Sequence, residues 1–341
     1  MTRVRLIEVA RAAGVHPGTA SRALNPNTRD EVNQHTVQRV ALAAEQLGYL
    51  PNTLARGLRT SRSFVAALVI PDITNNLFPP IVRGAEQVLS GAGFTLVLTD
   101  TNNDAGLERG QVASMRAHGV DGFIIATARW HDPLVQELAG AGVPTVLVNR
   151  RTARTALPFV GADDQRGIRL CVEHLVRSGH RDIVHLAGPS DTSTGRARVS
   201  AFRSALREYE VPPRRSAVIE CSGYSEEAGI GGAQRLLDAR RSFTAIVAAN
   251  DLLALGAMDL LATVGLRCPA DYSITGFNDL PFMRKLSPPL TTVHVPLTDM
   301  GAAAARTLLA WIGTPDAVPA TPAMIPVELV VRGTTGPATS P

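Results

Sequence analysis

From residue 64 onward the chain alternates short apolar runs, rich in Val, Ile and Leu, with longer amphipathic segments. The apolar runs are predicted strands at 64–70, 94–99, 122–126, 144–149, 159–162, 183–187, 245–249, 273–277 and 291–295. The predicted helices fall at 79–92, 105–118, 132–141, 165–178, 196–208, 226–239, 252–264 and 298–312. Such alternation is typical of an α/β fold with parallel sheets that helices cover on both faces.

This alternation runs for roughly 230 residues, which is more than one doubly wound sheet needs, since single domains commonly hold about 100–150 residues. We therefore expect two similar lobes that divide near residue 160. Lobe 1 is expected at about 63–158 plus 296–320, and lobe 2 at about 159–292 plus 321–335.

The charge of the chain lies almost entirely at one end. Residues 1–62 hold nine Arg and four acidic side chains, a net charge of +5. The other 279 residues hold 25 basic and 26 acidic side chains, so the whole excess of +4 comes from the first fifth of the chain. A small basic segment on a near-neutral body indicates a polyanion-binding head on a separate globular module.

The basic segment has the apolar spacing of three short helices. The first helix carries its apolar face at Leu6, Val9, Ala10 and Ala13. Gly14 supplies a turn, and Pro17 suits the first position of a second helix that runs to about Leu24. The third helix follows Asn33, ends at Gly48 and carries an apolar stripe of Val37, Val40, Ala41, Ala44 and Leu47. This pattern predicts a small all-α helix-turn-helix domain over 1–50, with a plain three-helix bundle as the alternative.

In a helix-turn-helix the second helix lies in the major groove and its first turn reaches the base edges. We expect Arg22 to bind guanine, and Thr19 and Ser21 to hold phosphates. The full set of DNA contacts expected from this domain is His16, Pro17, Gly18, Thr19, Ser21, Arg22 and Asn25.

Residues 51–62 form a predicted linker between the head and the 63–335 body. Asn52 can cap a helix over 53–58, which is far shorter than the ~12–15 residues that an isolated helix needs in water. Arg56 and Arg59 flank the apolar Leu58. The segment is either a flexible linker or a hinge helix that orders on DNA and inserts Leu58 between base pairs in the minor groove.

Ligands of parallel sheets bind beyond the carboxyl ends of the strands. Polar residues stand at these positions in both predicted lobes, with aromatic residues close by. The expected ligand-binding residues are Asp72, Phe78, Asp100, Thr127, Asn149, Thr192, Thr194, Arg198, Tyr224, Asn250, Asp251 and Asn278. Such a set suits a ligand with many hydroxyl groups, whereas the alternative for each Asp or Asn is a simple helix cap.

Several other classes of protein do not fit. No stretch reaches the ~18 apolar residues of a membrane span, and the first residues have no secretory core, so we expect a soluble cytoplasmic protein. The chain has no Walker A loop and no Gly-x-Ser-x-Gly elbow. Neither the spacing of its three cysteines nor that of its histidines predicts a metal site. We expect no enzyme activity, no cofactor and no metal.

Two segments resemble the N-terminal signature of the LacI/GalR family of bacterial transcriptional repressors, namely LIEVARAAGVHPGTASRALN and LGYLPNTLARGLR. The body resembles the same family in GADDQRGIRLCVEHLVRSGHRDIVHLAGP and SITGFNDLPFMRKLSPPLTTVHVP. The resemblance implies the fold of periplasmic sugar-binding proteins for the body. It also implies a homodimer that binds a pseudo-palindromic double-stranded DNA operator, with a carbohydrate effector bound between the lobes.

The resemblance also implies roles for individual positions. Leu58 matches the intercalating leucine of the hinge, Ala55 its neighbour in the minor groove, and Pro17, Gly18 and Arg22 the base-reading positions. Asn149, Arg198, Asn250 and Asn278 match polar effector contacts, and Tyr224 matches an aromatic stacking position.

The sequence departs from the family pattern at a few positions. His16 replaces the Ser that caps the second helix, which predicts a loss of about 1 kcal/mol of helix-end stability, with a phosphate contact as the alternative role. Asn149 and Asn278 are amides where the lactose-type repressor has carboxylates. The short polar end of the sequence carries no leucine heptads and favours a dimer. Two other functions remain open, a sugar-binding protein whose basic head serves another polyanion and a carbohydrate-modifying enzyme.

Overall fold

The computed structural model describes residues 4–25, 28–49, 62–154, 156–212, 218–240, 242–314 and 322–338. The chain divides into two compact units, Met1–Ser63 and Phe64–Pro341. The first is a small helical unit and the second is an α/β body, as the division of the net charge predicts.

The first unit contains the three predicted helices. They are α1 (Leu6–Ala12), α2 (Pro17–Leu24) and α3 (Gln34–Gln46), with a 3-10 turn, η1 (Arg29–Glu31), between the last two. Gly14 has a φ of 62° between α1 and α2, a left-handed conformation that glycine adopts without strain. The buried residues of this unit are Val9, Ala10, Ala13, Ala20, Ala23, Val40, Ala43 and Ala44.

One prediction about α3 is wrong. Ala41 is exposed and Ala43 is buried, while the predicted Val40 and Ala44 are buried as expected. Leu47 is 39% exposed because it follows the last helical residue and lies at the C-cap.

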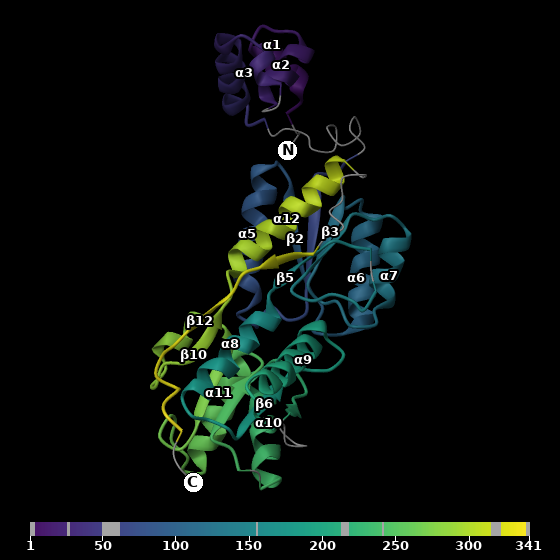
Figure 1. Ribbon diagram of the computed structural model, residues 1–341. Coiled ribbons are helices and arrows are strands. Elements are labelled where there is room, and N and C mark those ends of the chain that lie inside the picture. The colour runs from purple at the N-terminus through teal and green to yellow at the C-terminus, as the bar shows by residue number, and fades with distance from the viewer. Residues whose placement is uncertain are drawn as a thin grey trace. The chain divides into compact units, whose positions relative to one another are not determined.

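The body contains two six-stranded sheets, which define its two lobes (Figure 1). The first sheet has the order β11-β5-β4-β3-β1-β2 and the second the order β12-β10-β9-β8-β6-β7. The strands of the first sheet are β1 (Val65–Ile70), β2 (Thr95–Asp100), β3 (Gly122–Ile125), β4 (Thr145–Val148), β5 (Phe159–Ala162) and β11 (Ala323–Ile325). Those of the second are β6 (Ile183–Ala187), β7 (Val218–Glu220), β8 (Ala245–Ala248), β9 (Ser273–Asn278), β10 (Thr291–His294) and β12 (Glu328–Val330).

Every strand pair is parallel except β10 with β12, so the predicted α/β fold with parallel sheets is confirmed. The helices are α5 (Phe78–Gly91), α6 (Ala105–Ala117), α7 (Pro133–Gly140), α8 (Asp164–Arg177), α9 (Ser193–Glu208), α10 (Glu226–Asp238), α11 (Asp251–Thr263) and α12 (Leu297–Gly313), with a 3-10 turn η2 (Met283–Lys285). Each predicted helix of the body is present within a few residues of its expected bounds.

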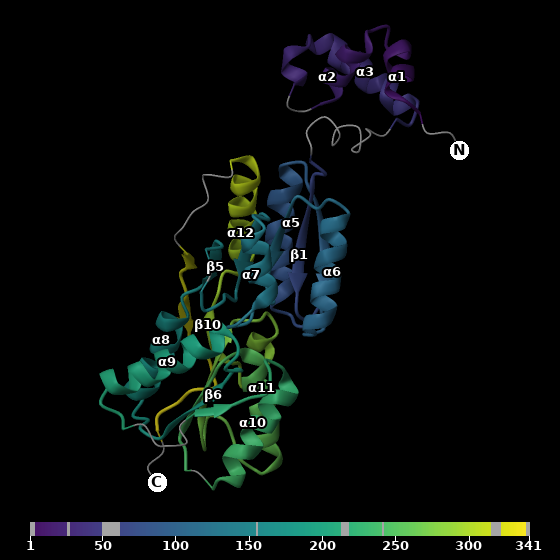
Figure 2. The ribbon, with the colours of Figure 1, turned by 90° about the vertical axis from the view of Figure 1, so that its right-hand side faces the viewer.

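Both faces of the central strands of each sheet are buried, as continuous apolar strands require, whereas the edge strand β2 is partly exposed. In β1, Leu68 packs into the cluster that contains α5 and α12, whereas its neighbour Val69 packs into the cluster that contains α6 and α7. In β8, Val247 belongs to the cluster with α8 and α9, and Ile246 to the cluster with α10 and α11. Figure 2 shows helices on both sides of each sheet.

The lobe boundaries differ from the prediction at two strands. β5 pairs with β4 and β11 in the first sheet, so residues 159–162 and 323–325 belong to lobe 1 rather than lobe 2. The alternating pattern is interrupted before β5, and the predicted boundary lies there for that reason. β5 nevertheless belongs to the first sheet, because it pairs with Leu147 and Val148 of β4. The three-residue strands β7, β11 and β12 are absent from the prediction.

The chain crosses between the lobes three times. It passes from β5 into α8, from β10 into α12, and from β11 into β12. Figure 1 shows the last crossing as the yellow segment that runs from lobe 1 into lobe 2. These crossings place the carboxyl ends of the strands of both sheets at the junction of the two lobes.

Candidate functional site

The helix-turn-helix unit presents polar and cationic groups on α2. His16, Gly18 and Arg22 are exposed, while Ala20 and Ala23 face the core. Pro17, Thr19, Ser21 and Asn25 are half-buried. The first turn and the cationic Arg22 are therefore accessible on one side of the helix, as groove binding requires.

The expected loss of the α2 cap is wrong. Nδ1 of His16 accepts a hydrogen bond from the backbone N–H of Gly18 at 3.1 Å. The imidazole nitrogen thereby replaces the hydroxyl oxygen that commonly caps a helix. This cap requires the Nδ1 atom to be unprotonated, because a protonated imidazole has no acceptor.

The remaining expected DNA contacts lie in the segment between the two units. Asn52, Ala55, Arg56, Leu58 and Arg59 are all outside the described residues, as is the predicted hinge helix. Their roles stay predictions.

The body has a cavity at the junction of its two lobes, which we call the cleft cavity. Its lining residues come from both lobes, and they are Asn75, Leu77, Phe78, Asn149, Arg150, Thr194, Arg198, Tyr224, Asn250 and Asn278. Most of them follow the carboxyl end of a strand or begin the next helix, where open α/β sheets bind their ligands. The cavity has room for about 20 Å³, roughly the space of one or two waters. In this conformation the lobes are closed.

Arg198 is the most constrained side chain of the cleft cavity, with 3% exposure. Its Nε and Nη2 atoms each lie 2.8 Å from Oδ1 of Asp164, and its Nη1 donates to the backbone oxygen of Ala249. Its guanidinium carbon is 3.8 Å from the centroid of the Phe277 ring. Burial raises the pKa of Asp164, and the charge of Arg198 opposes that rise. Three of the five N–H groups of Arg198 thus have partners in lobe 2 among the described residues.

Tyr224 is held by hydroxyl groups from the loop and first turn of α9. Its phenol oxygen lies 2.8 Å from Oγ1 of Thr194 and 3.2 Å from Oγ1 of Thr192. Nδ2 of Asn250 donates to the backbone oxygen of Tyr224 at 3.2 Å. These bonds fix an aromatic ring beside amide groups, an arrangement that binds the apolar face of a sugar ring together with its hydroxyls.

Asn149 and Asn278 occupy matching places, at the end of β4 in lobe 1 and at the end of β9 in lobe 2. Their φ angles are 63° and 112°, in the region that most side chains avoid. Asparagine tolerates a positive φ better than most residues. Both side chains are buried and line the cleft cavity.

Arg150 lies next to Asn149 and was not among the predicted site residues. Its Nε atom is buried without a hydrogen-bond partner among the described residues. The guanidinium lies 5.5 Å from the centroid of the Tyr224 ring, a cation–π contact across the cavity. Burial lowers the pKa of Arg150, partly offset by Tyr224 and Asp191.

Three of the predicted ligand-binding residues of lobe 1 do not line the cleft cavity. Asp72 accepts hydrogen bonds from the backbone and hydroxyl of Thr74, and Asp100 accepts from the backbone of Asn102 and Ile73. These carboxylates cap their own loops. Oγ1 of Thr127 donates to the carboxyl of Glu108 in α6, whose pKa burial raises. Each strand-end group is used by its nearest backbone or helix.

Two predicted residues of lobe 2 also lie outside the lining. Thr192 is the N-cap of α9 and contacts the cavity indirectly, through the hydroxyl of Tyr224. Asp251 is fully buried and accepts from the backbone of Leu280 at 2.7 Å and from Oγ1 of Thr292 at 2.5 Å. Burial raises the pKa of Asp251 to about 7. Asp251 therefore joins α11 to β10 and does not line the cleft cavity.

The lobes also contact each other at one rim of the cleft. The backbone N–H of Trp130 donates to the oxygen of Asp191 at 2.6 Å, and that of Arg151 donates to Oγ of Ser193 at 2.9 Å. The guanidinium of Arg196 lies 5.0 Å from the centroid of the Trp130 ring. These contacts join the two lobes at this rim.

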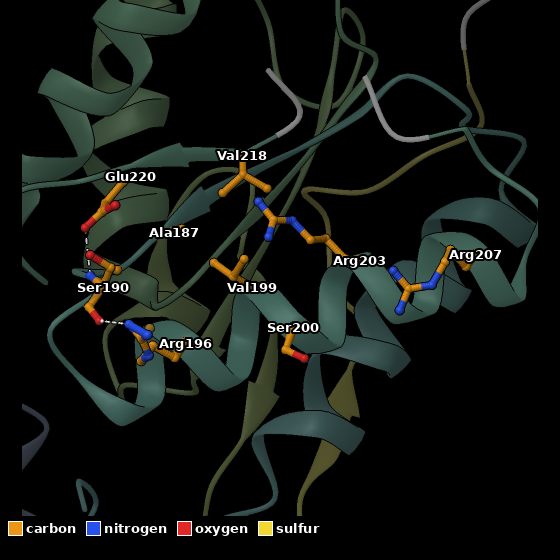
Figure 3. Close-up of a pocket in the computed structure, with 11 residues that line it drawn as sticks. Ala187, Ser190, Arg196, Val199, Ser200, Arg203, Arg207, Val218 and Glu220 are labelled. Atoms are coloured by element: carbon orange, nitrogen blue, oxygen red, sulfur yellow. Dashed lines mark hydrogen bonds between the residues drawn. The ribbon is translucent and has the colours of Figure 1, made fainter. Parts of the chain in front are cut away.

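A second, wider cavity of about 440 Å³ lies on lobe 2, against α9 (Figure 3). Arg196, Arg203 and Arg207 line it together with Glu220. Oε1 of Glu220 accepts from the backbone of Ser190, and Nη1 of Arg196 donates to the backbone oxygen of Ser190. All three arginines are exposed to solvent, and the lining comes from one lobe. We call this the outer cavity.

No three His, Cys, Asp or Glu side chains within the described ranges are grouped so that they could hold a metal ion. No helix of the part of the chain that the structure describes is long and apolar enough to cross a membrane.

Comparison with known proteins gives the same division of the chain. Residues 5–52 match bacterial regulatory proteins of the lacI family, and residues 172–335 match a periplasmic binding protein-like domain. The ribose operon repressor of Halalkalibacterium halodurans is 32% identical over 335 residues, which cover 98% of this chain and 97% of that protein.

Solved structures agree with these matches. The lac repressor dimer bound to operator and the anti-inducer ONPF has a TM-score of 0.83 and 27% identity, and the match covers 98% of this chain and 100% of that one. The complex of the transcriptional regulator CelR with cellobiose has a TM-score of 0.74 and 30% identity, covering 97% and 100%. A helix-turn-helix joined to a two-lobed ligand-binding body defines a DNA-binding transcriptional regulator. The chain belongs to the lacI family of bacterial regulatory proteins.

Proposed function

We propose that this protein represses transcription by binding a pseudo-palindromic operator as a homodimer, and that a carbohydrate effector in the cleft cavity controls its affinity for that operator. The observation that carries the proposal is the joining in one chain of an exposed α2 with Arg22 and a polar cavity lined from two lobes. Two-fold symmetry of the dimer matches the symmetry of an operator with two half-sites. In this proposal the protein acts in the cytoplasm as a regulator of transcription and not as an enzyme.

The chemistry of the cleft cavity supports a carbohydrate. Four asparagines line it, together with the Thr194 hydroxyl, two guanidinium groups and the aromatic residues Phe78 and Tyr224. Amides donate and accept hydrogen bonds and so match hydroxyl groups, while aromatic rings cover the apolar face of a sugar. Similar proteins are named for sugars, since one is a ribose operon repressor and another was solved with cellobiose.

Closure of the lobes is the step that connects the two functions. The cavity of about 20 Å³ is smaller than a sugar, so we expect an effector to bind when the lobes lie further apart. An effector that contacts both walls then favours a defined angle between the lobes. Because three chain crossings restrict how the lobes can move, this angle alone sets how lobe 1 is oriented relative to lobe 2. A hinge helix over 53–58, folded only on DNA, is the element that would transmit the change.

Operator binding tests the first half of this proposal. Footprinting of the full chain on genomic fragments is expected to show a protected two-fold symmetric site. Arg22→Ala removes one guanine contact, worth about 1–3 kcal/mol, and should lower operator affinity about 10- to 100-fold. The matched control Arg177→Ala removes an exposed arginine from α8 in the body and should leave the affinity unchanged. Binding that is equally strong on unrelated DNA would contradict the proposal.

The predicted hinge gives a separate test. Leu58→Ala is expected to weaken specific operator binding at least about 10-fold and to reduce bending of the operator, because the wedge side chain is lost. Gel mobility with circularly permuted operator fragments measures the bend. If both affinity and bend stay as in the parent, the segment is a flexible linker.

A further inference from the structure

The charges of the cleft cavity point to more than a neutral sugar. Its lining contains two guanidinium groups, Arg150 and Arg198, and no carboxylate among the described residues. Positions 149 and 278, at the ends of β4 and β9, are uncharged asparagines. The cavity is therefore cationic unless a neighbouring group balances each arginine.

One of the two arginines is balanced within the protein. Arg198 bonds to Asp164 through two nitrogens at 2.8 Å, and the pair is almost fully buried, with side-chain exposures of 4% and 14%. Its third nitrogen donates to the backbone oxygen of Ala249. The charge of Arg198 is thus compensated before any ligand binds.

The other arginine has no ion pair of its own among the described residues. The charge of Asp191 offsets the cost of burying Arg150 only in part, and the Nε of Arg150 is buried without a hydrogen-bond partner among the described residues. The Tyr224 ring, with its centroid 5.5 Å away, is the group that faces the guanidinium. Leaving a charged donor buried without a hydrogen-bond partner costs free energy. An unpaired donor in a ligand cavity is accounted for when the ligand supplies its partner.

The chemistry of Arg150 restricts what that partner is. A guanidinium presents a planar fork of N–H donors that matches a carboxylate or a phosphate with two parallel hydrogen bonds. Such charge-assisted bonds are roughly twice as strong as those to neutral hydroxyls. The nearby Asn149, Asn250 and Asn278 amides remain available for hydroxyl groups of the same ligand.

We propose that the effector of the cleft cavity is an anionic carbohydrate, either a sugar acid or a sugar phosphate, whose negative group binds Arg150. This inference rests on the proposed effector role of the cleft cavity. The anion would lie between Arg150 of lobe 1 and the guanidinium of Arg198 in lobe 2, and so bind both walls. Binding both walls makes the charge of the ligand part of the force that closes the lobes.

Calorimetry and thermal shift on the full chain test the proposal with a fixed set of probes. Gluconate and glucuronate carry a carboxylate, glucose 6-phosphate and ribose 5-phosphate carry a phosphate, and glucose and ribose are the neutral partners. Inorganic phosphate and acetate control for binding of the ion alone. At least one anionic sugar is expected to bind at least about 10-fold more tightly than its neutral partner, and the two arms identify the carboxylate or the phosphate.

Two variants assign the effect to Arg150. Arg150→Gln should lower affinity for the anionic sugar about 10- to 100-fold, with little change for neutral sugars. The control Arg203→Gln removes one exposed positive charge from the outer cavity and should leave affinity as in the parent.

Three results overturn the proposal. They are equal binding of neutral and anionic sugars, an affinity unchanged by Arg150→Gln, and binding of inorganic phosphate or acetate as tight as that of the sugar. A probe set in which no anionic sugar binds counts equally against it. Operator binding of the ligand-free chain, measured in parallel, tests the regulatory function separately.

Discussion

On the lobe 2 wall of the cleft cavity, Arg198, Tyr224 and Asn250 are each held by side-chain hydrogen bonds to neighbours in the same lobe. On the lobe 1 wall, the Asn75 side chain accepts a bond from the backbone of Leu77, and the Nε of Arg150 has no partner among the described residues. The two walls therefore differ in how far they are organised before binding. A preorganised wall loses little conformational freedom when a ligand arrives. The lobe 1 wall gains its missing partners from the ligand.

The largest expected effect is that of a substitution at Asp164, which supports the lobe 2 wall. Asp164→Asn leaves the buried Arg198 without its carboxylate and should lower the free energy of unfolding by about 3 kcal/mol. Urea denaturation of the full chain measures this change. The control Arg169→Gln breaks an ion pair with Glu208 in which both partners are about half-exposed, and it should leave stability unchanged because solvent screens such pairs. A loss from Asp164→Asn no larger than that of the control would show that the lobe 2 wall does not depend on this pair.

The lobe 2 wall also has a support that depends on pH. His185 in β6 is fully buried, its Nδ1 lies 2.7 Å from the oxygen of Val247, and its ring stacks on Phe202 in α9 at 5.0 Å. Burial lowers the pKa of His185 to about 4, against 6.5 for the free side chain. In the unfolded chain His185 is therefore protonated below about pH 6.5, whereas in the folded chain it stays neutral down to about pH 4. The stability contributed by neutral His185 is complete above pH 6.5 and is lost as the pH falls.

His185→Gln removes this titration and keeps a donor for the Val247 oxygen. Between pH 7 and pH 5 the variant should lose about 2 kcal/mol less unfolding free energy than the parent. Urea denaturation at both pH values measures the difference. Asp251, whose raised pKa of about 7 makes stability fall as the pH rises from 4 to 7, acts equally in both proteins and cancels. The exposed His131 provides the control, since His131→Gln should follow the parent at both pH values.

A smaller change tests the hydroxyl contacts of the same wall. Tyr224→Phe keeps the ring but removes the oxygen that bonds to Thr192 and Thr194. Stability should fall by about 1 kcal/mol, the usual value of such hydrogen bonds. Thermal unfolding measures it. An unchanged melting temperature would show that the two threonines do not hold the ring, and the lobe 2 wall would then resemble the lobe 1 wall.

The smallest effect has the opposite sign and sharpens the contrast. Arg150→Gln removes a charged group whose Nε is buried without a hydrogen-bond partner among the described residues, so the free protein should become more stable by about 0.5 kcal/mol. The measurement is urea denaturation without sugars, beside Asp164→Asn. A destabilisation as large as that of Asp164→Asn would mean that Arg150 is paired within the protein.

The sequence predicts where polar groups gather but not which way they point. The rule that ligands bind at strand ends selects Asn149, Asn250 and Asn278, which all line the cleft cavity, and their role in binding stays a prediction. The same rule selects Asp72 and Asp100, whose carboxylates accept backbone N–H groups two or more residues away. Short acidic side chains readily bond to their own loops, and this competition is settled by backbone geometry that a residue pattern does not contain.

Other differences have the same local origin. Arg150 stands one residue beyond a predicted site residue, and it lines the cleft cavity together with residues of lobe 2. His16 caps α2 through a ring nitrogen, a role that propensities assign to hydroxyl and amide oxygens. β11 and β12 have three residues each, which is too short to show a strand periodicity in the sequence. They are strands because of their hydrogen-bonded partners in the two sheets. The longer helices and the strands of continuous apolar residues are predicted from the pattern itself.

The three passages of chain between the lobes have a mechanical consequence. Two lobes that are connected by three neighbouring segments cannot slide or separate freely. The motion that remains is essentially one rotation about the line through those connections. A single distance across the cleft, measured between two spectroscopic probes, would then report the whole conformation of the body. Substitutions far from the three connecting segments can therefore change which ligand binds, while the motion between the lobes stays the same.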